Sequence, residues 1–515
     1  MKKVIRGCSF LLCFALLCTP VFAETTAAEV VSDSTADVVA LGEDVSLREP
    51  NVKYLNLSDG TAKAVVYADA VHYQKGDTWE EIDNSLTAAV LLGDGATGQV
   101  QRLDTLTATQ RLTLSREART EGQVRYADYL ENNANDFIVQ LPRELAPEKP
   151  VMVRNKEHTL RFVPLNLTDS TARVTQPTDQ PVMTAALYDS AREEQQEQMT
   201  TVTGYKSKVE YSAVSDQVDL RYFVVGQRLK EDLLLQELPR QTEFSFDFTT
   251  DLRPVLNEDN TVSFLDAQDN LIFMVEAPRM YDMGDGYSRD ITVTVEPTAQ
   301  GCRYTLTPDR EWLEAEERVY PVTLDPSVVT TPDPHFIQDT GVQESNPDTN
   351  YYMMDRIYVG SGPNSTQGRL FLKLNRWPSV NTLNENSILY TLLTLNYYPR
   401  ANFQTGYNIR FLVRRLESDW QSSTLTWNSQ KSITSWPMCY YDIGDRRNVE
   451  KQRDVTYVDD WVKLHYRDPS TDYGIRIQPE TVTSTINRVC YISSDYAADY
   501  YAHPWIEIVY DPAYA

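Results

Sequence analysis

Apolar and polar positions alternate through much of this chain, in short runs separated by Gly, Pro, Asn and Asp. Residues 62–74, 135–142 and 243–250 are rich in β-branched and aromatic side chains, and turn residues bound each run. A period of two between turn signals predicts β-strands. The pair Asp269-Asn270 lies between two apolar runs, which predicts a hairpin turn. We therefore expect a mainly β protein.

One stretch, residues 454–477, departs from this alternation. It carries apolar side chains about 3.6 residues apart, which predicts a short amphipathic helix: Val455, Val458, Trp461, Val462 and Leu464. Asp454 and Thr456 are candidate N-caps, and Asp468-Pro469 is a candidate stop. A lone helix in a β-rich region commonly closes one end of a sandwich. Here Trp461 would fill that end.

The length of 515 residues allows two or three domains, each with its own core. We expect β-rich domains at residues 47–187 and 202–328, separated by a polar run and followed by a Thr/Pro-rich joint. Six of the eight tryptophans lie in residues 334–515, and this aromatic density is typical of a β-sandwich core or a ligand surface. We expect a jelly-roll-like sandwich with one short helix there.

The first 23 residues have a basic start, a short apolar run and Ala23 after Val-Phe, which predicts a secretory signal peptide. The apolar run is too short to favour a membrane anchor. A lipoprotein signal at Cys18 is a weaker alternative, since a leucine precedes the cysteine. Residues 24–46 are small and acidic and predict a flexible linker. We expect a secreted or cell-wall-associated protein without a transmembrane segment in its mature chain.

The formal net charge of −26 argues against nucleic acid or anionic lipid as a partner, because Lys and Arg bind those ligands. Beyond the leader the chain has Cys302, Cys439 and Cys490, too few for a disulfide framework. Cys439 and Cys490 could pair. The sequence does not show whether their Cα atoms lie close enough.

The search for catalytic motifs finds little. Residues 93–98 match GxGxxG, but no convincing helix follows, so a Gly-rich turn is the better interpretation. The five histidines have no zinc or triad spacing and are interpreted as isolated side chains: His72, His158, His335, His465 and His503. A glycosidase-type carboxylate pair stays open, since sequence does not show a separation across a cleft. We expect no catalytic residues and no enzyme.

The C-terminal part carries several motifs in a fixed order. They are Asp339, Asn346-Pro347, Asn350-Tyr351, residues 357–360 (IYVG), residues 369–374 (RLFLKL), Trp420, residues 424–428 (TLTWN) and residues 472–475 (DYGI). Over about 180 residues this part resembles the DNRLRE domain of secreted bacterial proteins, which is similar to carbohydrate-binding β-sandwich modules. The resemblance implies the sandwich fold and a polysaccharide ligand.

The region 45–325 carries Tyr73, residues 79–86 (WEEIDNSL), residues 219–222 (DLRY), Lys230-Glu231 and residues 320–326 (YPVTLDP). It resembles the N-terminal part of large wall-associated bacterial proteins that continue into Rhs or YD repeats. The sequence up to residue 515 contains no such repeats, so we do not expect a function drawn from repeats or from a toxin tip.

Two sets of residues are candidate binding sites. Sugars stack on exposed aromatic rings, and paired tyrosines offer such rings, although packing within the protein is the alternative for each: Tyr351, Tyr352, Tyr440, Tyr441, Tyr500 and Tyr501. Hard oxygen ligands gather in one predicted loop and make calcium a candidate ion, with Asx-turn chemistry as the alternative: Asp339, Asp348, Asn350 and Asp355. We expect no other cofactor.

The sequence thus predicts a non-enzymatic exported protein whose C-terminal module binds polysaccharide or another cell-wall component. The rival hypothesis is a structural or assembly protein that packs against a protein partner without binding sugar. The two differ in whether aromatic rings are exposed on one face of the sandwich.

Overall fold

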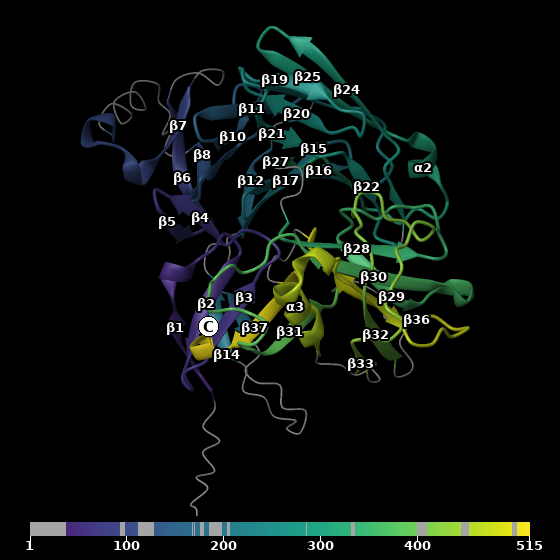
Figure 1. Cartoon of the computed structure of the whole chain (residues 1–515). Helices are drawn as coiled ribbons and strands as arrows, with labels where there is room; N and C mark the ends of the chain where they lie inside the picture. Colours follow the sequence, from purple (N-terminus) through teal and green to yellow (C-terminus); the bar gives the residue numbers. More distant parts are fainter. Residues whose placement is uncertain are drawn as a thin grey trace, which may run out of the picture. The chain divides into compact units, whose positions relative to one another are not determined.

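The computed structural model describes residues 38–514 apart from 93–97, 112–127, 167, 169, 176–179, 185–197, 203–205, 285, 331–334, 399–408, 444–452 and 497–501. The predicted signal peptide, most of the predicted linker, the GxGxxG match up to residue 97, Tyr500 and Tyr501 lie outside these residues. The described chain is mainly β, with short helices only, which confirms the predicted fold class (Figure 1).

Two antiparallel sheets form the sandwich that contains the C-terminal residues. One has six strands in the order β1 (Ala40–Glu43), β2 (Val52–Leu57), β3 (Ala62–Val66), β37 (Trp505–Tyr510), β31 (Ile388–Asn396) and β34 (Arg453–Tyr457). The other has the order β33 (Cys439–Ile443), β32 (Ile409–Arg415), β35 (Ile475–Pro479), β30 (Gln367–Leu374), β29 (Arg356–Ser361) and β36 (Asn487–Ile492), and β28 (Ile337–Gln343) also pairs with β30. Apolar side chains of both sheets form one core, as in packed sandwiches.

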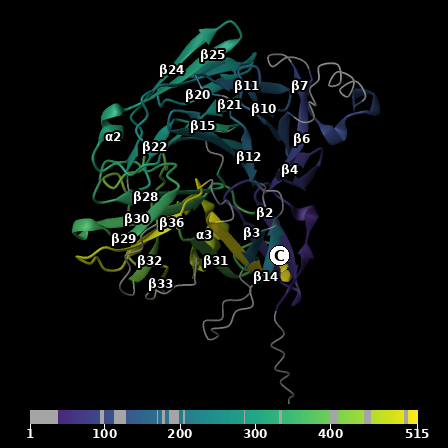
Figure 2. The same ribbon diagram turned by 180° about the vertical axis from the view of Figure 1, so that it is seen from behind.

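The first three strands of the described chain complete this C-terminal sheet. In Figures 1 and 2 the purple β2 and β3 lie beside the yellow β37, and the register pairs Ala64 with Ile508. Lys63 Nζ lies 2.8 Å from Glu507 Oε2, and both side chains are buried. The strand pairing therefore does not follow the boundary expected at residue 47. Alternation predicts a strand and its buried face, but not a partner 444 residues away.

A second pair of large sheets is built from residues 83–329. The nine-stranded sheet has the order β24 (Ile291–Thr298), β25 (Gly301–Pro308), β18 (Phe244–Thr249), β11 (His158–Pro164), β10 (Val151–Asn155), β9 (Phe137–Pro142), β8 (Tyr129–Ala134), β6 (Asp83–Leu92) and β7 (Gln99–Arg102). The eleven-stranded sheet has the order β12 (Ala172–Thr175), β15 (Lys206–Ser215), β16 (Val218–Val225), β17 (Arg228–Leu235), β27 (Val328–Val329), β21 (Leu271–Val275), β20 (Val262–Leu265) and β19 (Arg253–Leu256), joined by β22 (Arg279–Tyr281), β23 (Tyr287–Ser288) and β26 (Val322–Asp325).

These two sheets share one hydrophobic core. Strand β11 pairs with β18, and β12 pairs with β15, so segments on both sides of the polar run at residues 188–201 enter the same sheets. The two β-rich domains expected at 47–187 and 202–328 are thus interleaved around one core. The Asp269-Asn270 turn closes the β20–β21 hairpin, and Asp269 adopts a positive φ of 63°.

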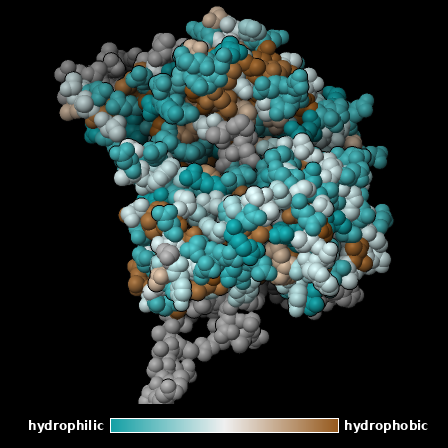
Figure 3. Space-filling view, in the orientation of Figure 1, coloured by the Kyte–Doolittle hydropathy of each residue, from teal (hydrophilic) through white to brown (hydrophobic). Residues whose placement is uncertain are grey.

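Smaller elements complete the described chain. They are the hairpins β4 (His72–Lys75) with β5 (Thr78–Glu81) and β13 (Gln180–Thr184) with β14 (Gln198–Val202), helix α2 (Arg310–Glu314), and the 3-10 turns Val45–Leu47, Leu103–Thr105, Pro363–Ser365, Pro469–Thr471 and Pro512–Tyr514. No helix among the described residues is long and apolar enough to cross a membrane. On the face in Figure 3, hydrophilic side chains predominate and smaller hydrophobic patches lie between them.

Helix α3 (Asp459–Arg467) confirms the predicted amphipathic helix. Trp461 has no exposed surface, belongs to the sandwich core, and donates its indole N–H to Asp472 Oδ1 at 2.7 Å. The helix ends at Arg467 with Asp468 at the C-cap, where the sequence predicted the stop. The predicted N-caps are wrong: Asp454 and Thr456 lie in strand β34, and the residue at the N-cap is Val458.

Candidate functional site

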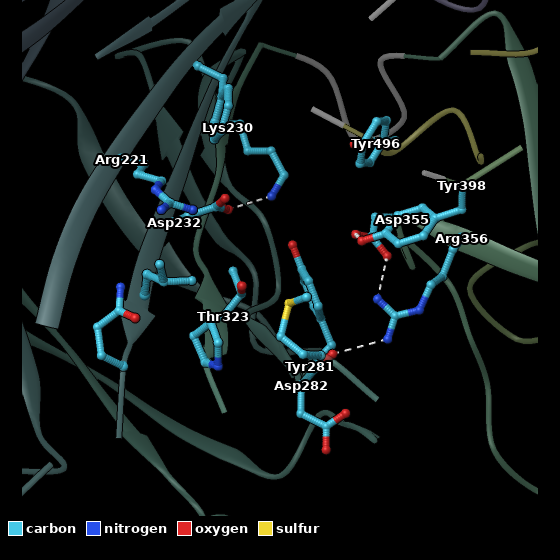
Figure 4. Close-up of a pocket in the computed structure, with 15 residues that line it drawn as sticks. Arg221, Lys230, Asp232, Tyr281, Asp282, Thr323, Asp355, Arg356, Tyr398 and Tyr496 are labelled. Atoms are coloured by element: carbon cyan, nitrogen blue, oxygen red, sulfur yellow. Dashed lines mark hydrogen bonds and ion pairs between the residues drawn. The ribbon is translucent and has the colours of Figure 1, made fainter. Parts of the chain in front are cut away.

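A polar pocket of about 210 Å³ lies between the strands of the larger core and the segments that lead into the C-terminal sandwich (Figure 4). The larger core contributes lining residues from β16, β17, β22 and β26. The C-terminal sandwich contributes the start of β29 and residues after β31 and β36. The charged and tyrosine side chains of this lining are Arg221, Lys230, Asp232, Tyr281, Asp282, Asp355, Arg356, Tyr398 and Tyr496.

Strand β17 brings alternate charged side chains to the pocket. Lys230 and Asp232 share one face of the strand, and Lys230 Nζ lies 2.5 Å from Asp232 Oδ1. Glu231 points to the opposite face, where its Oε1 accepts a hydrogen bond from Tyr222 at 3.2 Å. Burial raises the pKa of Asp232, and the charge of Lys230 opposes that rise. Strand β17 is buried along its whole length, and its charged residues have polar partners on both faces of the strand.

Asp325, at the end of β26, is the centre of the ion network behind the pocket. It is fully buried and lies 2.5 Å from Lys230 Nζ and 2.5 Å from a guanidinium nitrogen of Arg279. Burial would raise the pKa of Asp325, but the charges of Arg279 and Lys230 outweigh that effect and lower it. Asp325 is therefore a carboxylate that compensates two buried cations.

The other side of the pocket is held by Arg356. Its guanidinium lies 3.2 Å from Asp355 Oδ1 and donates to the backbone carbonyl of Asp282 at 3.1 Å and to that of Gly284. Tyr398 donates its hydroxyl to Asp355 Oδ2 at 3.0 Å. Because Asp282 belongs to the larger core and Arg356 begins β29 of the sandwich, this contact ties the two together.

A buried histidine cluster extends the network. His335 Nδ1 lies 2.9 Å from Asp69 Oδ1, and His335 Nε2 lies 3.1 Å from Asp495 Oδ1. His503 Nδ1 lies 3.3 Å from the second oxygen of Asp69. Burial would lower the pKa of His335, but the charge of Asp69, with help from Asp495 and against Arg228, raises it to about 10.

The sequence predicts isolated, satisfied histidines at His335 and His503; each does have polar partners, but the two share Asp69 and so are not isolated. The fold brings them to one carboxylate from distant segments, and no local spacing in the sequence could have signalled that contact.

Glu276 is the exception in this network. It is buried, and neither carboxylate oxygen accepts a hydrogen bond from the described residues. Burial raises the pKa of Glu276 to about 7, although Arg228 and Arg279 oppose the rise. Burial without a hydrogen-bond donor thus favours the protonated form of this carboxyl.

The cations that line the pocket are neutralised by neighbouring carboxylates. Lys230 faces Asp232 and Asp325, Arg356 faces Asp355, and Arg221 lies 3.0 Å from Glu210. Among the described residues, no group of three or more His, Cys, Asp or Glu side chains could hold a metal ion. These ion pairs hold segments of the two cores together. Each described cation of the pocket lining already has a carboxylate partner, so none is left to bind a phosphate group.

The four described tyrosines of the candidate pairs do not share one exposed face. Tyr351 is buried and packs against Tyr287, while Tyr352 is half-buried. Tyr441 is half-buried, and its hydroxyl oxygen lies 3.1 Å from that of Tyr491. Tyr440 has 59% of its surface exposed. Neighbouring tyrosines in a strand point to opposite faces, so the pairs divide between core and surface.

The candidate calcium ligands do not converge on one site. Asp339 is buried and accepts hydrogen bonds from Ser494, and Asp355 is held by Arg356 and Tyr398. Two others lie in surface loops: Asp348 accepts from Asn428 at 2.7 Å, and Asn350 donates to the carbonyls of Ser422 and Leu425 at 2.7 Å each. Each side chain has its own protein partners, which corrects the calcium hypothesis. Cys302, Cys439 and Cys490 are all free thiols, so Cys439 and Cys490 do not pair.

No family model matches the chain. It is similar to three curated bacterial proteins. They are the "tRNA(Glu)-specific nuclease WapA" of Bacillus subtilis subsp. natto (strain BEST195), at 24% identity, the "tRNA3(Ser)-specific nuclease WapA" of Bacillus spizizenii, at 23%, and the "tRNA nuclease WapA" of Bacillus subtilis (strain 168), at 24%. Each similarity extends over 425 residues and covers 78% of this chain. The chain spans 15% of the length of each relative.

These relatives are nucleases. Their names overturn the prediction of a non-enzymatic carbohydrate-binding protein, the cell-wall ligand that went with it, and the exclusion of nucleic acid as a partner. The net charge led to that exclusion because it averages over the whole chain, whereas nucleic acid is bound by local groups of cations.

Proposed function

We propose that this chain forms part of a nuclease that acts on tRNA. The observation that supports the proposal is the similarity over 425 residues, 78% of this chain, to three proteins that are all named as tRNA nucleases. Because the chain spans 15% of those proteins, both the activity and the substrate belong to the proposal. Export of the chain, predicted from its first 23 residues, is proposed with it.

Within such a nuclease, the residues described here would act as a β framework of fixed geometry. Two hydrophobic cores meet at a buried ion network in which Lys230, Arg279 and Asp325 neutralise one another. Buried charges that lose a partner are strongly destabilising, so such a network favours one arrangement of the segments that contribute to it. The cations of the pocket are occupied in this way, and contacts to RNA would come from another surface.

The test replaces the matching segment of the Bacillus subtilis (strain 168) relative with this chain. Cleavage of purified tRNA by the chimera is followed on denaturing gels. A second chimera carries an unrelated β-sandwich of the same length at the same place, as a matched control. We expect tRNA cleavage by the first chimera and its loss or strong reduction in the control.

Two results would overturn the proposal: a folded chimera that does not cleave tRNA, or equal cleavage by the chimera and its control. The chain by itself is assayed on the same gels. Cleavage there would support the proposal and locate the catalytic groups within this chain.

A further inference from the structure

The outer face of the seven-stranded sheet carries three adjacent arginines from three strands. Arg414 on β32 lies directly opposite Arg476 on β35, and Arg369 on β30 shares their face. The intervening residues, such as Leu370 and Ile477, point inward to the sandwich core. We name Arg369, Arg414 and Arg476, with the aromatic residues beside them, the arginine face.

Neutral oxygens surround these three guanidinium groups. Arg369 donates to the side-chain oxygens of Gln367 and Gln430, Arg414 to the carbonyls of Thr434 and Ser435, and Arg476 to Gln430 and Gln478. None of the three forms an ion pair with a carboxylate of the described residues, in contrast to the cations of the pocket.

The arginine face therefore concentrates uncompensated positive charge in a chain whose formal net charge is −26. Residues directly opposite in a sheet have Cβ atoms about 4.5–5.5 Å apart, so Arg414 and Arg476 repel each other. Arg476 is 7% exposed, and its Nε has no hydrogen-bond partner among the described residues. Burial, followed by the charges of Arg369 and Arg414, lowers the pKa of Arg476 to about 9. An anion placed here would relieve this repulsion.

Aromatic rings border the same face. The guanidinium carbon of Arg369 lies 4.1 Å from the centre of the Trp427 ring. Trp436, next in the chain to the carbonyls that hold Arg414, is 84% exposed, and Tyr440 on β33 is 59% exposed. Exposed rings beside arginines suit a single-stranded nucleic acid, since its bases stack on the rings and its phosphates accept from guanidinium groups.

We propose that the arginine face binds the phosphate groups of a single-stranded RNA segment, with Trp436 available for base stacking. The choice of RNA rests on the proposed function. Planar guanidinium groups match phosphate oxygens in a bidentate geometry. The amide oxygen of Gln430 accepts from Arg369 at 2.8 Å and from Arg476 at 3.4 Å, and a phosphate oxygen that bound both arginines would take its place.

The experiment measures binding of the full chain to a fluorescein-labelled single-stranded RNA of about twelve nucleotides. Fluorescence anisotropy is recorded over a series of salt concentrations. Each single-strand phosphate contact contributes about 0.7 to the slope of log K against log salt, so R369Q and R414Q should each lower the slope by about that amount. W436A should weaken binding without changing the slope.

R410Q is the matched control. Arg410 lies on the same strand and the same face as Arg414, but it is paired with Asp442 at 2.8 Å. Because its charge is already paired, R410Q should leave the slope within error; the affinity is not compared for this variant, since the Arg410 guanidinium carbon also lies 4.4 Å from the centre of the Tyr440 ring. Thermal unfolding checks that each variant is folded, and R476Q should be at least as stable as the parent because it removes a repelled charge.

An unchanged slope in the folded R369Q/R414Q double variant, or an equal loss in R410Q, would overturn the proposal. Tighter binding of polyglutamate than of RNA would also overturn it, in favour of an acidic protein partner. The chimera assay does not depend on these arginines, so its failure alone would reject the proposed function and leave a measured RNA-binding surface in place.

Discussion

Replacing Asp325 with Asn should destabilise the protein strongly, because Asp325 is the shared counterion of two buried cations. Its carboxylate lies 2.5 Å from both Lys230 Nζ and the guanidinium of Arg279. Asn has nearly the same shape and cannot carry the charge. Lys230 would keep Asp232 at 2.5 Å. Arg279 would keep a contact from its guanidinium to the Met353 sulfur at 3.2 Å, while its Nε already lacks a partner.

The expected cost follows from this loss of compensation. Removing one partner of a buried ion pair costs about 3–5 kcal/mol, since the remaining charge stays buried. Domains are stable by only about 5–15 kcal/mol, so the Asp325→Asn variant should unfold at a much lower urea concentration. Urea unfolding followed by tryptophan fluorescence and by circular dichroism measures the change.

The matched control is Asp247→Asn, which breaks the partly exposed pair with Arg303. An exposed ion pair contributes little to stability because solvent screens it, so the control should unfold at nearly the same urea concentration as the parent. The combined replacement of Arg279 and Asp325 with Met and Leu should recover much of the lost stability, because both members of that buried pair are removed and Lys230 still pairs with Asp232. If Asp325→Asn and Asp247→Asn unfolded at the same urea concentration, Asp325 would not stabilise this fold as the shared counterion of Lys230 and Arg279.

Three further outcomes follow from the structure. The pKa of Glu276 is raised from 4.5 to about 7. Its contribution to the stability of the fold is therefore fully present below pH 4.5 and is lost as the pH rises through 7. The melting temperature of the parent should fall over this pH range, and Glu276→Gln should make that fall smaller. If the two pH profiles coincide, the buried acid does not control this dependence. Trp461→Ala should cost about 3–5 kcal/mol in urea unfolding, whereas the same change at exposed Trp436 should cost little, and equal effects would contradict the placement of Trp461 in the core. Calcium and EDTA should give the same melting temperature, and a rise of several degrees with calcium would show a site that the described residues do not form.

Local pattern predicted much of the fold. The alternation of apolar residues predicted the strands, and a period of 3.6 residues predicted helix α3 and the burial of Trp461. Strand pairing was harder, since β3 finds its partner β37 more than 400 residues later. A period describes one element at a time, and the pairing of strands depends on the whole core.

The candidate site was missed for a related reason. Asp69, His335 and His503 are far apart in the sequence and come into contact only in the folded structure, so no local motif marks them. The arginine face left a clearer signal. Arg369 precedes Leu370, and Arg476 lies between two isoleucines; cations that alternate with core residues in a strand point outward from a sandwich. Placing them on adjacent strands required the sheet order.

The placement of carboxylates, rather than the number of cations, distinguishes the two charged regions of this protein. In the pocket each lining cation faces a carboxylate, and a phosphate would have to displace an anion that the fold needs. On the arginine face the acceptors are amides and backbone carbonyls, which a phosphate can replace without leaving a buried charge. A chain of net charge −26 can therefore contact RNA through one local surface, and weakening that surface should change RNA binding while the ion network keeps the fold intact.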